Sequence, residues 1–247
     1  MIDINPALEV PIQHDIANIF HQWATAPHSE VLAIGQRQNA NLPAPVNSIS
    51  AQYVWFARKA RLPVVSHFCS LPGPGPKGQS SYERGLVALA YSILRQFIEL
   101  APPLLDCCLG GHLESLDLAT GTVSSWEKVL SAIDTVLHFM PPLLICIIDG
   151  LDVIYNESTD DHIRSLLRIL FRHASYPEVI PMYDRTTKSV LFKGLITVTG
   201  QPSWLMEALA ENRKSPDTPT AEDDSLQKEL VRIPGSDLWA VTMSSST

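Results

Sequence analysis

Residues 143–152 read LLICIIDGLD, and this stretch carries the strongest fold signal in the chain. Six consecutive apolar residues, preceded by Pro141-Pro142 and followed by Asp149-Gly150, are too few for the core of a helix. They are typical of a strand buried on both faces, as the strands of parallel sheets are. Asp149 then lies where the strand leaves the sheet, and Asp152 follows closely. Because open α/β sheets bind ligands at the carboxyl ends of their strands, this pair marks a candidate site.

The two carboxylates have two readings on these residues alone. In a nucleotide-hydrolysing fold, Asp149 would hold a magnesium ion through water, and Asp152 would orient or deprotonate the attacking water. Alternatively, Asp149-Gly150 is a turn that ends the strand and leaves a solvated carboxylate. The rest of the chain has to decide between them.

Composition restricts the classes of protein that the chain can represent. Its 247 residues, 45% of them hydrophobic, suit one α/β domain of ordinary size. A formal net charge of -8 without a Lys/Arg cluster argues against nucleic-acid and acidic-membrane partners. The N-terminus lacks a basic region followed by an apolar run, and no stretch approaches the roughly 18–20 apolar residues of a membrane span. We therefore expect a cytoplasmic protein, with its four cysteines reduced.

Apolar runs and helical periodicities alternate along the chain, which predicts an α/β fold of three layers, a five-stranded parallel sheet flanked by helices. The expected strands are 31–34, 62–69, 143–148, 193–199 and 229–233, and the expected helices lie near 12–26, 48–61, 82–100, 124–139, 160–172 and 202–210. Residues 1–30 form an amino-terminal lead-in, residues 31–235 the core, and residues 236–247 a polar tail.

Residues 71–80, LPGPGPKGQS, imitate a phosphate-binding Walker A loop, with Gln79 where a lysine is required. We discount the likeness because three prolines remove backbone N–H donors and Gln79 supplies no charge. The loop is expected to be exposed and to project away from Asp149.

Four segments together resemble the NACHT-type branch of the signal-transducing (STAND) P-loop NTPases, in the form common in fungi. They are His67-Phe68-Cys69, the helical stretch 89–96 (LAYSILRQ), the Walker B-like strand 145–152, and the sensor-like strand end 197–202 (TVTGQP). The resemblance covers about residues 15–235. It implies a P-loop NTPase-like sheet with the final short strand at one edge, followed by the strands at 31, 194, 143 and 63.

The chain departs from that family where phosphate should bind. Gly35 is followed by Gln36-Arg37-Gln38-Asn39, and no Gly-Lys-Ser/Thr occurs before the next helix. The arginine expected in the sensor segment is Gln201. Each charge-assisted contact to phosphate that is lost weakens nucleotide binding by roughly 1.5–3 kcal/mol. The residues that the resemblance assigns to a site are Asp152 as catalytic, Asp149 as metal ligand, and Gly35, Arg37, Asp149 and Thr199 as cofactor-binding, with Arg37 the candidate substitute for the lysine.

Three functions remain after these departures. The first is a degenerate NACHT-like domain, a pseudoenzyme that acts as an interaction or signalling scaffold, needs no cofactor, and has protein partners that include a second copy of itself. The second is an unusual ATPase or GTPase that uses magnesium, Asp149, Asp152, and either Arg37 or the loop 73–80. The third is an unrelated metal-dependent hydrolase that uses Asp149 and Asp152. The spacing of the histidines argues against it, because no two of them are spaced as paired metal ligands: His67, His112, His162 and His173. Without nucleotide, Asp149 needs other partners, and the candidates are backbone N–H groups of the following turn, Thr197 or Thr199, and Arg37. We expect solvent and the threonine hydroxyls to supply most of the hydrogen bonds.

Overall fold

The computed structural model describes residues 14–36, 45–73, 79–101, 121–175, 190–200, 203–213, 231–232 and 238–244. Its helices are α1 (His14–Thr25), α2 (Pro45–Lys59), α3 (Ser81–Leu100), the 3-10 turn η1 (Val123–Ser125), α5 (Trp126–Leu137), the 3-10 turn η2 (Leu151–Ile154), α6 (Asp160–Ser175) and α7 (Ser203–Arg213). Its strands are β1 (Glu30–Gln36), β2 (Val64–Phe68), β3 (Leu143–Asp149), β4 (Leu191–Thr199), β5 (Val231–Arg232) and β6 (Leu238–Ser244).

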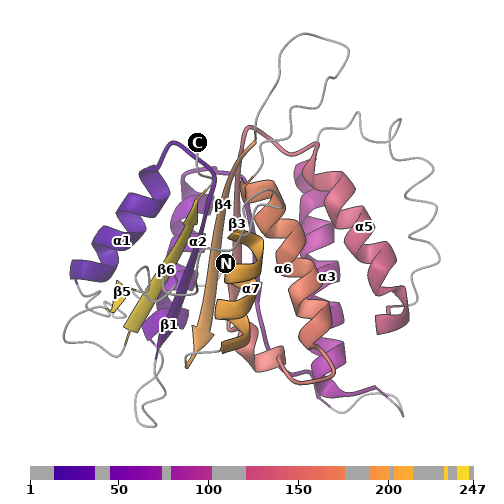
Figure 1. Ribbon diagram of the computed structural model, residues 1–247. Coiled ribbons are helices and arrows are strands. Elements are labelled where there is room, and N and C mark those ends of the chain that lie inside the picture. Colours follow the sequence, from indigo (N-terminus) through magenta and orange to yellow (C-terminus); the bar gives the residue numbers. More distant parts are fainter. Residues whose placement is uncertain are drawn as a thin grey trace.

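The strands form one sheet in the order β2-β3-β4-β1-β6-β5 (Figure 1). β2, β3, β4 and β1 are parallel, and β3 lies between β2 and β4 as the apolar run 143–148 predicts. The order of these four strands, 63-143-194-31, is the one that we expected. The chain is therefore an α/β protein whose sheet is flanked by helices.

The expectation of a wholly parallel sheet of five strands is wrong. β6 pairs with β1 in the antiparallel direction, and the two-residue β5 pairs with β6, so the sheet is mixed and has six strands. β6 also lies within residues 236–247, which we took for a polar tail. The link between β5 and β6 is too short for a crossover, so these two strands can pair only in the antiparallel direction. β5 does lie at the sheet edge, but β6 separates it from β1.

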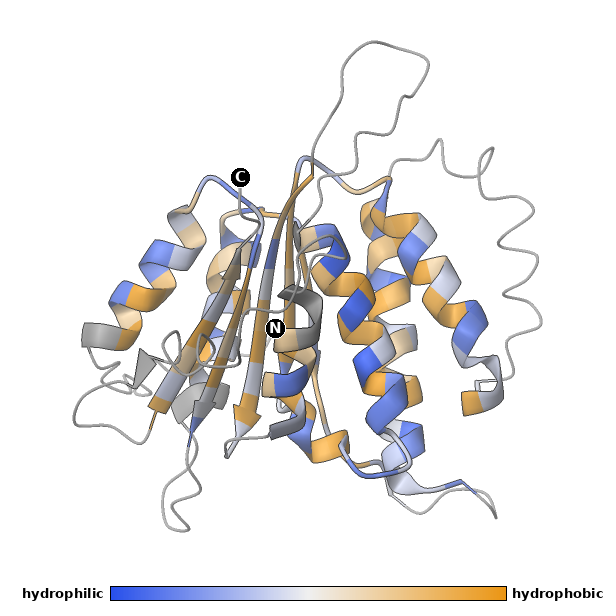
Figure 2. Ribbon diagram, viewed as in Figure 1, coloured by the Kyte–Doolittle hydropathy of each residue, from blue (hydrophilic) through white to orange (hydrophobic). Residues whose placement is uncertain are grey.

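Helices cover both faces of the sheet and give three layers. α1 and α2 pack on one face, whereas α3, α5, α6 and α7 pack on the other (Figure 1). Residues of β3 alternate between the two cores, with Leu144, Cys146 and Ile148 on the α3/α5 side and Ile145 and Ile147 on the α2 side. Figure 2 shows the strands as largely apolar, in agreement with burial on both faces.

The outer edge of β2 is covered by a side chain of α3. Gln96 accepts a hydrogen bond from the Ser66 N–H at 3.0 Å and donates one to the Ser66 carbonyl at 3.0 Å, as a neighbouring strand would. α3 itself begins with a capping box in which Ser80 and Glu83 exchange hydrogen bonds. The side chain of Ser80 therefore caps a helix. The hydrogen bonds of Gln96 to Ser66 hinder the pairing of β2 with another chain.

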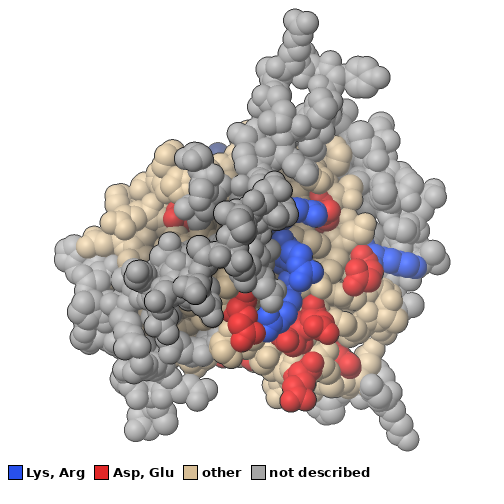
Figure 3. Space-filling view, in the orientation of Figure 1, with Lys and Arg blue, Asp and Glu red and all other residues tan. Residues whose placement is uncertain are grey.

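Charged side chains of both signs lie next to one another on the face shown in Figure 3. Arg164 of α6 contacts Asp160 at 2.9 Å and Glu207 of α7 at 2.9 Å, so this mixed surface joins the two helices. Among the helices that the structure describes, none combines the length and the apolar character that a membrane span requires.

Candidate functional site

The candidate site lies at the carboxyl edge of the parallel strands. Asp149 is the last residue of β3, and Gly150 turns the chain with a φ of 69° that favours glycine. The turn leads directly into η2, which carries Asp152. The neighbouring strand β4 ends at Thr199, so the end of β3 and the end of β4 bring the two carboxylates and the two threonines together.

Asp149 is 5% exposed and takes a hydrogen bond from the adjacent strand. The Thr197 hydroxyl donates to Asp149 Oδ1 at 2.5 Å and accepts from the Gly150 N–H at 3.1 Å. The expectation that a threonine hydroxyl bonds the carboxylate is confirmed, whereas the expected role of solvent is wrong because the side chain is buried. One hydroxyl thus serves both the buried carboxylate and the backbone of the turn that follows it.

Asp152 is bound by the end of β4 in a similar way. The Thr199 N–H donates to Asp152 Oδ1 at 2.9 Å, so Thr199 contributes its backbone amide. Burial raises the pKa of Asp152, the Asp149 charge adds to this increase, and hydrogen bonds from Thr199 oppose it. The like charges of the two carboxylates therefore repel each other, as expected.

Gly35 lies in β1, one residue before the strand ends, where Trp239 of β6 packs on it. A Cβ atom at Gly35 would lie 2.1 Å from the Trp239 ring, and the indole N–H donates to the Gly200 carbonyl at 2.7 Å. The Gly200 N–H in turn donates to the Gln36 carbonyl at 2.5 Å. The close approach of the Trp239 ring to the backbone of β1 thus explains the glycine, and Trp239 joins the ends of β1 and β4.

The remaining predicted site residues fall partly outside the described residues. Arg37 and Gln201 lie outside them, as does the middle of the loop 71–80, residues 74–78, so its expected projection away from Asp149 stays a prediction. Cys69, just before this loop, donates its backbone N–H to the Asp149 carbonyl at 2.8 Å. Burial, reinforced by the charges of Asp149 and Asp152, raises the pKa of the Cys69 thiol far above its usual range, so it stays protonated.

Our reading of the histidines missed a second cluster, which lies near the amino ends of the parallel strands. Asp134, His138 and His173 offer ligand atoms that all lie within 4.8 Å of one another. The sequence holds a partial signal, because Asp134 and His138 are spaced i,i+4 and share a helix face. His173 comes from the next helix, and only the packing of α5 on α6 brings it to the other two.

Comparison of the chain with protein-family models, with curated proteins and with solved structures gives no match. The resemblance to NACHT-type NTPases therefore rests on the four sequence segments.

Proposed function

We propose that the chain is a degenerate NACHT/STAND-like domain with a P-loop NTPase-like fold that acts as an interaction or signalling scaffold. In this proposal nucleotide hydrolysis is lost, and the ligands are proteins, among them a second copy of the chain. The parallel strand order β2-β3-β4-β1 supports the fold part of the proposal.

The observation that carries the functional part is the Asp149–Thr197 hydrogen bond. A carboxylate that holds magnesium through water accepts hydrogen bonds from the metal's water ligands, whereas Asp149 is buried and its Oδ1 already accepts from Thr197 on the neighbouring strand. The sequence adds that Gly-Lys occurs nowhere in the chain, so the phosphate-binding lysine of a Walker A loop has no counterpart.

Exposed aromatic side chains support a role in protein contacts. On α2, Trp55 is 52% and Phe56 61% exposed. Large exposed apolar groups are features of interaction surfaces. Sedimentation at increasing protein concentration would test whether a second copy of the chain is a partner.

A magnesium-dependent ATPase or GTPase is the second candidate function, and the environment of Asp152 favours it. A carboxylate with a raised pKa, close to a second carboxylate at a sheet edge, has the properties of a general base. In this reading Asp149 holds the magnesium ion.

Thermal melting with and without magnesium and ATP or GTP separates the two functions. For a working site, nucleotide at about 100-fold above its Kd adds about 2.7 kcal/mol to the free energy of unfolding. That corresponds to a rise in Tm of roughly 5–11 °C for a chain of this size. We expect no rise for the wild-type protein.

Two variants identify the site if a rise is seen. A rise that disappears in Asp149→Asn but persists in Asp161→Asn, an exposed carboxylate of α6, would establish the NTPase reading and overturn the scaffold proposal. A rise that persists in both variants would place the nucleotide away from Asp149.

A further inference from the structure

The cluster of Asp134, His138 and His173 lies at the amino edge of the parallel strands. α5 ends just before the start of β3, and α6 runs parallel to α5 and ends on the side where β4 starts (Figure 1). Because β3 is seven residues long, this edge is roughly 20 Å from Asp149. The cluster is therefore separate from the carboxyl-edge site and independent of the function proposed for it.

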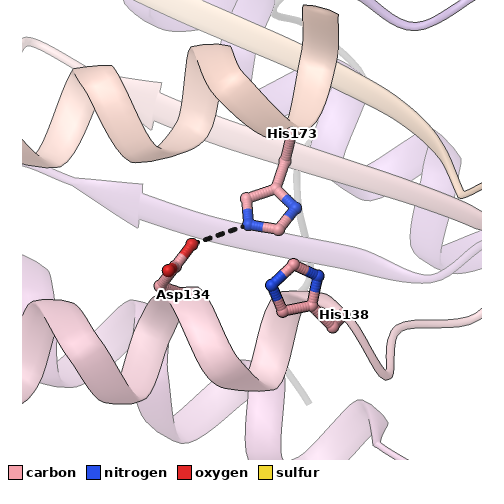
Figure 4. Close-up of side chains that lie close together, drawn as sticks. All are labelled: Asp134, His138 and His173. Atoms are coloured by element: carbon pink, nitrogen blue, oxygen red, sulfur yellow. Dashed lines mark hydrogen bonds and ion pairs between the residues drawn. The ribbon is translucent and has the colours of Figure 1, made fainter. Parts of the chain in front are cut away.

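The three side chains point towards one another (Figure 4). His173 Nε2 lies 2.9 Å from Asp134 Oδ1, and the ring centres of His138 and His173 are 4.7 Å apart. A tetrahedral zinc ion with ligands at about 2.05 Å separates neighbouring ligand atoms by about 3.3 Å. No two ligand atoms of the cluster are more than 4.8 Å apart, so each separation has to contract by at most about 1.5 Å to fit a zinc ion.

The type of ligand selects the metal. Imidazole nitrogens suit zinc and its neighbours cobalt, nickel and copper, whereas magnesium and calcium prefer oxygen ligands. Two histidines and one carboxylate also make up a common set of three protein ligands for zinc, which leaves a fourth position for water.

Arg172 is the group that competes with a cation. Its guanidinium forms an ion pair with Asp134 Oδ1, the oxygen that also faces His173. The Arg172 side chain is 49% exposed, so it can withdraw into solvent when a cation takes its place. Its positive charge weakens cation binding, and this gives the site a specific, testable signature.

We propose that Asp134, His138 and His173 bind a zinc ion that joins the end of α5 to α6. The site takes Zn²⁺ with a water molecule in the fourth position, in exchange for the ion pair between Arg172 and Asp134. Because the ligands come from two helices, only the folded chain presents all three, and zinc stabilises the packing of α5 on α6.

Calorimetric titration of chelator-treated protein with zinc chloride tests the proposal, with the visible spectrum of bound Co²⁺ as a second readout of tetrahedral coordination. We expect one zinc ion per chain. The key variant is His138→Gln, which keeps the hydrogen bond between Asp134 and His173 and so preserves the contact between the helices. It should weaken binding at least about tenfold, since even the loss of a group that only supports a ligand costs 10–100-fold.

Two further variants sharpen the test. Arg172→Gln removes the competing charge and should tighten zinc binding by about two- to fivefold, the equivalent of an exposed ion pair. His21→Gln, an exposed histidine of α1, is the matched control and should bind zinc like the wild-type protein. Circular dichroism verifies that each variant is folded before titration.

Two results would overturn the proposal. The first is a wild-type protein without saturable zinc binding in the micromolar range, which would mean that the cluster is only an ion pair between helices. The second is binding that His138→Gln leaves unchanged, or that His21→Gln lowers to the same extent, because zinc would then bind elsewhere on the surface.

Discussion

Replacing Thr197 by valine removes the hydroxyl that connects β4 to the end of β3. Valine has nearly the same shape and an equal preference for strands, so the backbone of β4 should persist. The change deprives Asp149 Oδ1 of a donor and the Gly150 N–H of an acceptor, and both groups are buried. The substitution therefore isolates the polar contribution of a single atom.

The magnitude follows from the two broken hydrogen bonds. An unsatisfied buried N–H costs about 1–3 kcal/mol, and the lost bond to a charged group about 1.5–3 kcal/mol. The added methyl group returns about 0.8 kcal/mol through apolar burial. The net loss is about 2–5 kcal/mol, which lowers Tm by roughly 4–20 °C for a chain of this size.

Urea unfolding of Thr197→Val, analysed for both midpoint and slope, measures this loss. The control is Thr135→Val, because the Thr135 hydroxyl donates to the Ser131 carbonyl at 2.8 Å on an exposed helix surface. It should change the free energy of unfolding by no more than about 0.5 kcal/mol. If Thr197→Val costs no more than this control, the hydroxyl does not compensate Asp149, and the reasoning behind the scaffold proposal fails.

Three other substitutions test neighbouring parts of the argument. Asp152→Asn keeps the acceptor for the Thr199 N–H and removes a carboxylate whose pKa is raised by folding, and such a carboxylate costs stability as pH rises from 3.8 through its folded pKa. Tm at neutral pH should therefore increase by a few degrees, and the gain should vanish in acid. A gain that is independent of pH would contradict this. Gln96→Leu removes both hydrogen bonds to Ser66 and should cost about 1–3 kcal/mol in urea unfolding, whereas exposed Gln52→Leu should cost little. Gly35→Ala forces the Trp239 ring to move and should cost about 1–3 kcal/mol, and Trp239→Leu in the same chain should recover part of that loss; an alanine tolerated without cost would refute the close packing.

The elements that could be predicted from sequence are those whose signal is local. The apolar run of β3 and the helical periodicity of α5 each specify one element, and the family resemblance supplied the order of the four parallel strands. The partner of Asp149 was predicted in part, because a carboxylate requires a donor and Thr197 on the adjacent strand supplies one, whereas the solvent that we also expected has little access to the buried side chain.

The features that the sequence left hidden depend on contacts between distant segments. Residues 238–241, LWAV, are apolar enough for a strand, but their direction and register come from pairing with β1 and from the hairpin with β5. The histidine cluster is similar, since α6 must pack on α5 before His173 can reach Asp134. Neither the pairing of β6 nor the approach of His173 to Asp134 can be predicted from the residue spacing within one segment.

β6 also bears on what the carboxyl edge can do. In a nucleotide site the loop after β1 and the end of the sensor strand must both offer groups to phosphate. In this chain Trp239 packs on Gly35 of β1 and hydrogen-bonds Gly200 after β4, while Thr199 and Thr197 hold Asp152 and Asp149. A ligand at these groups would have to exchange existing hydrogen bonds for its own, and such an exchange contributes little net free energy. The contacts that order this part of the carboxyl edge therefore support the proposal of a scaffold over that of an enzyme.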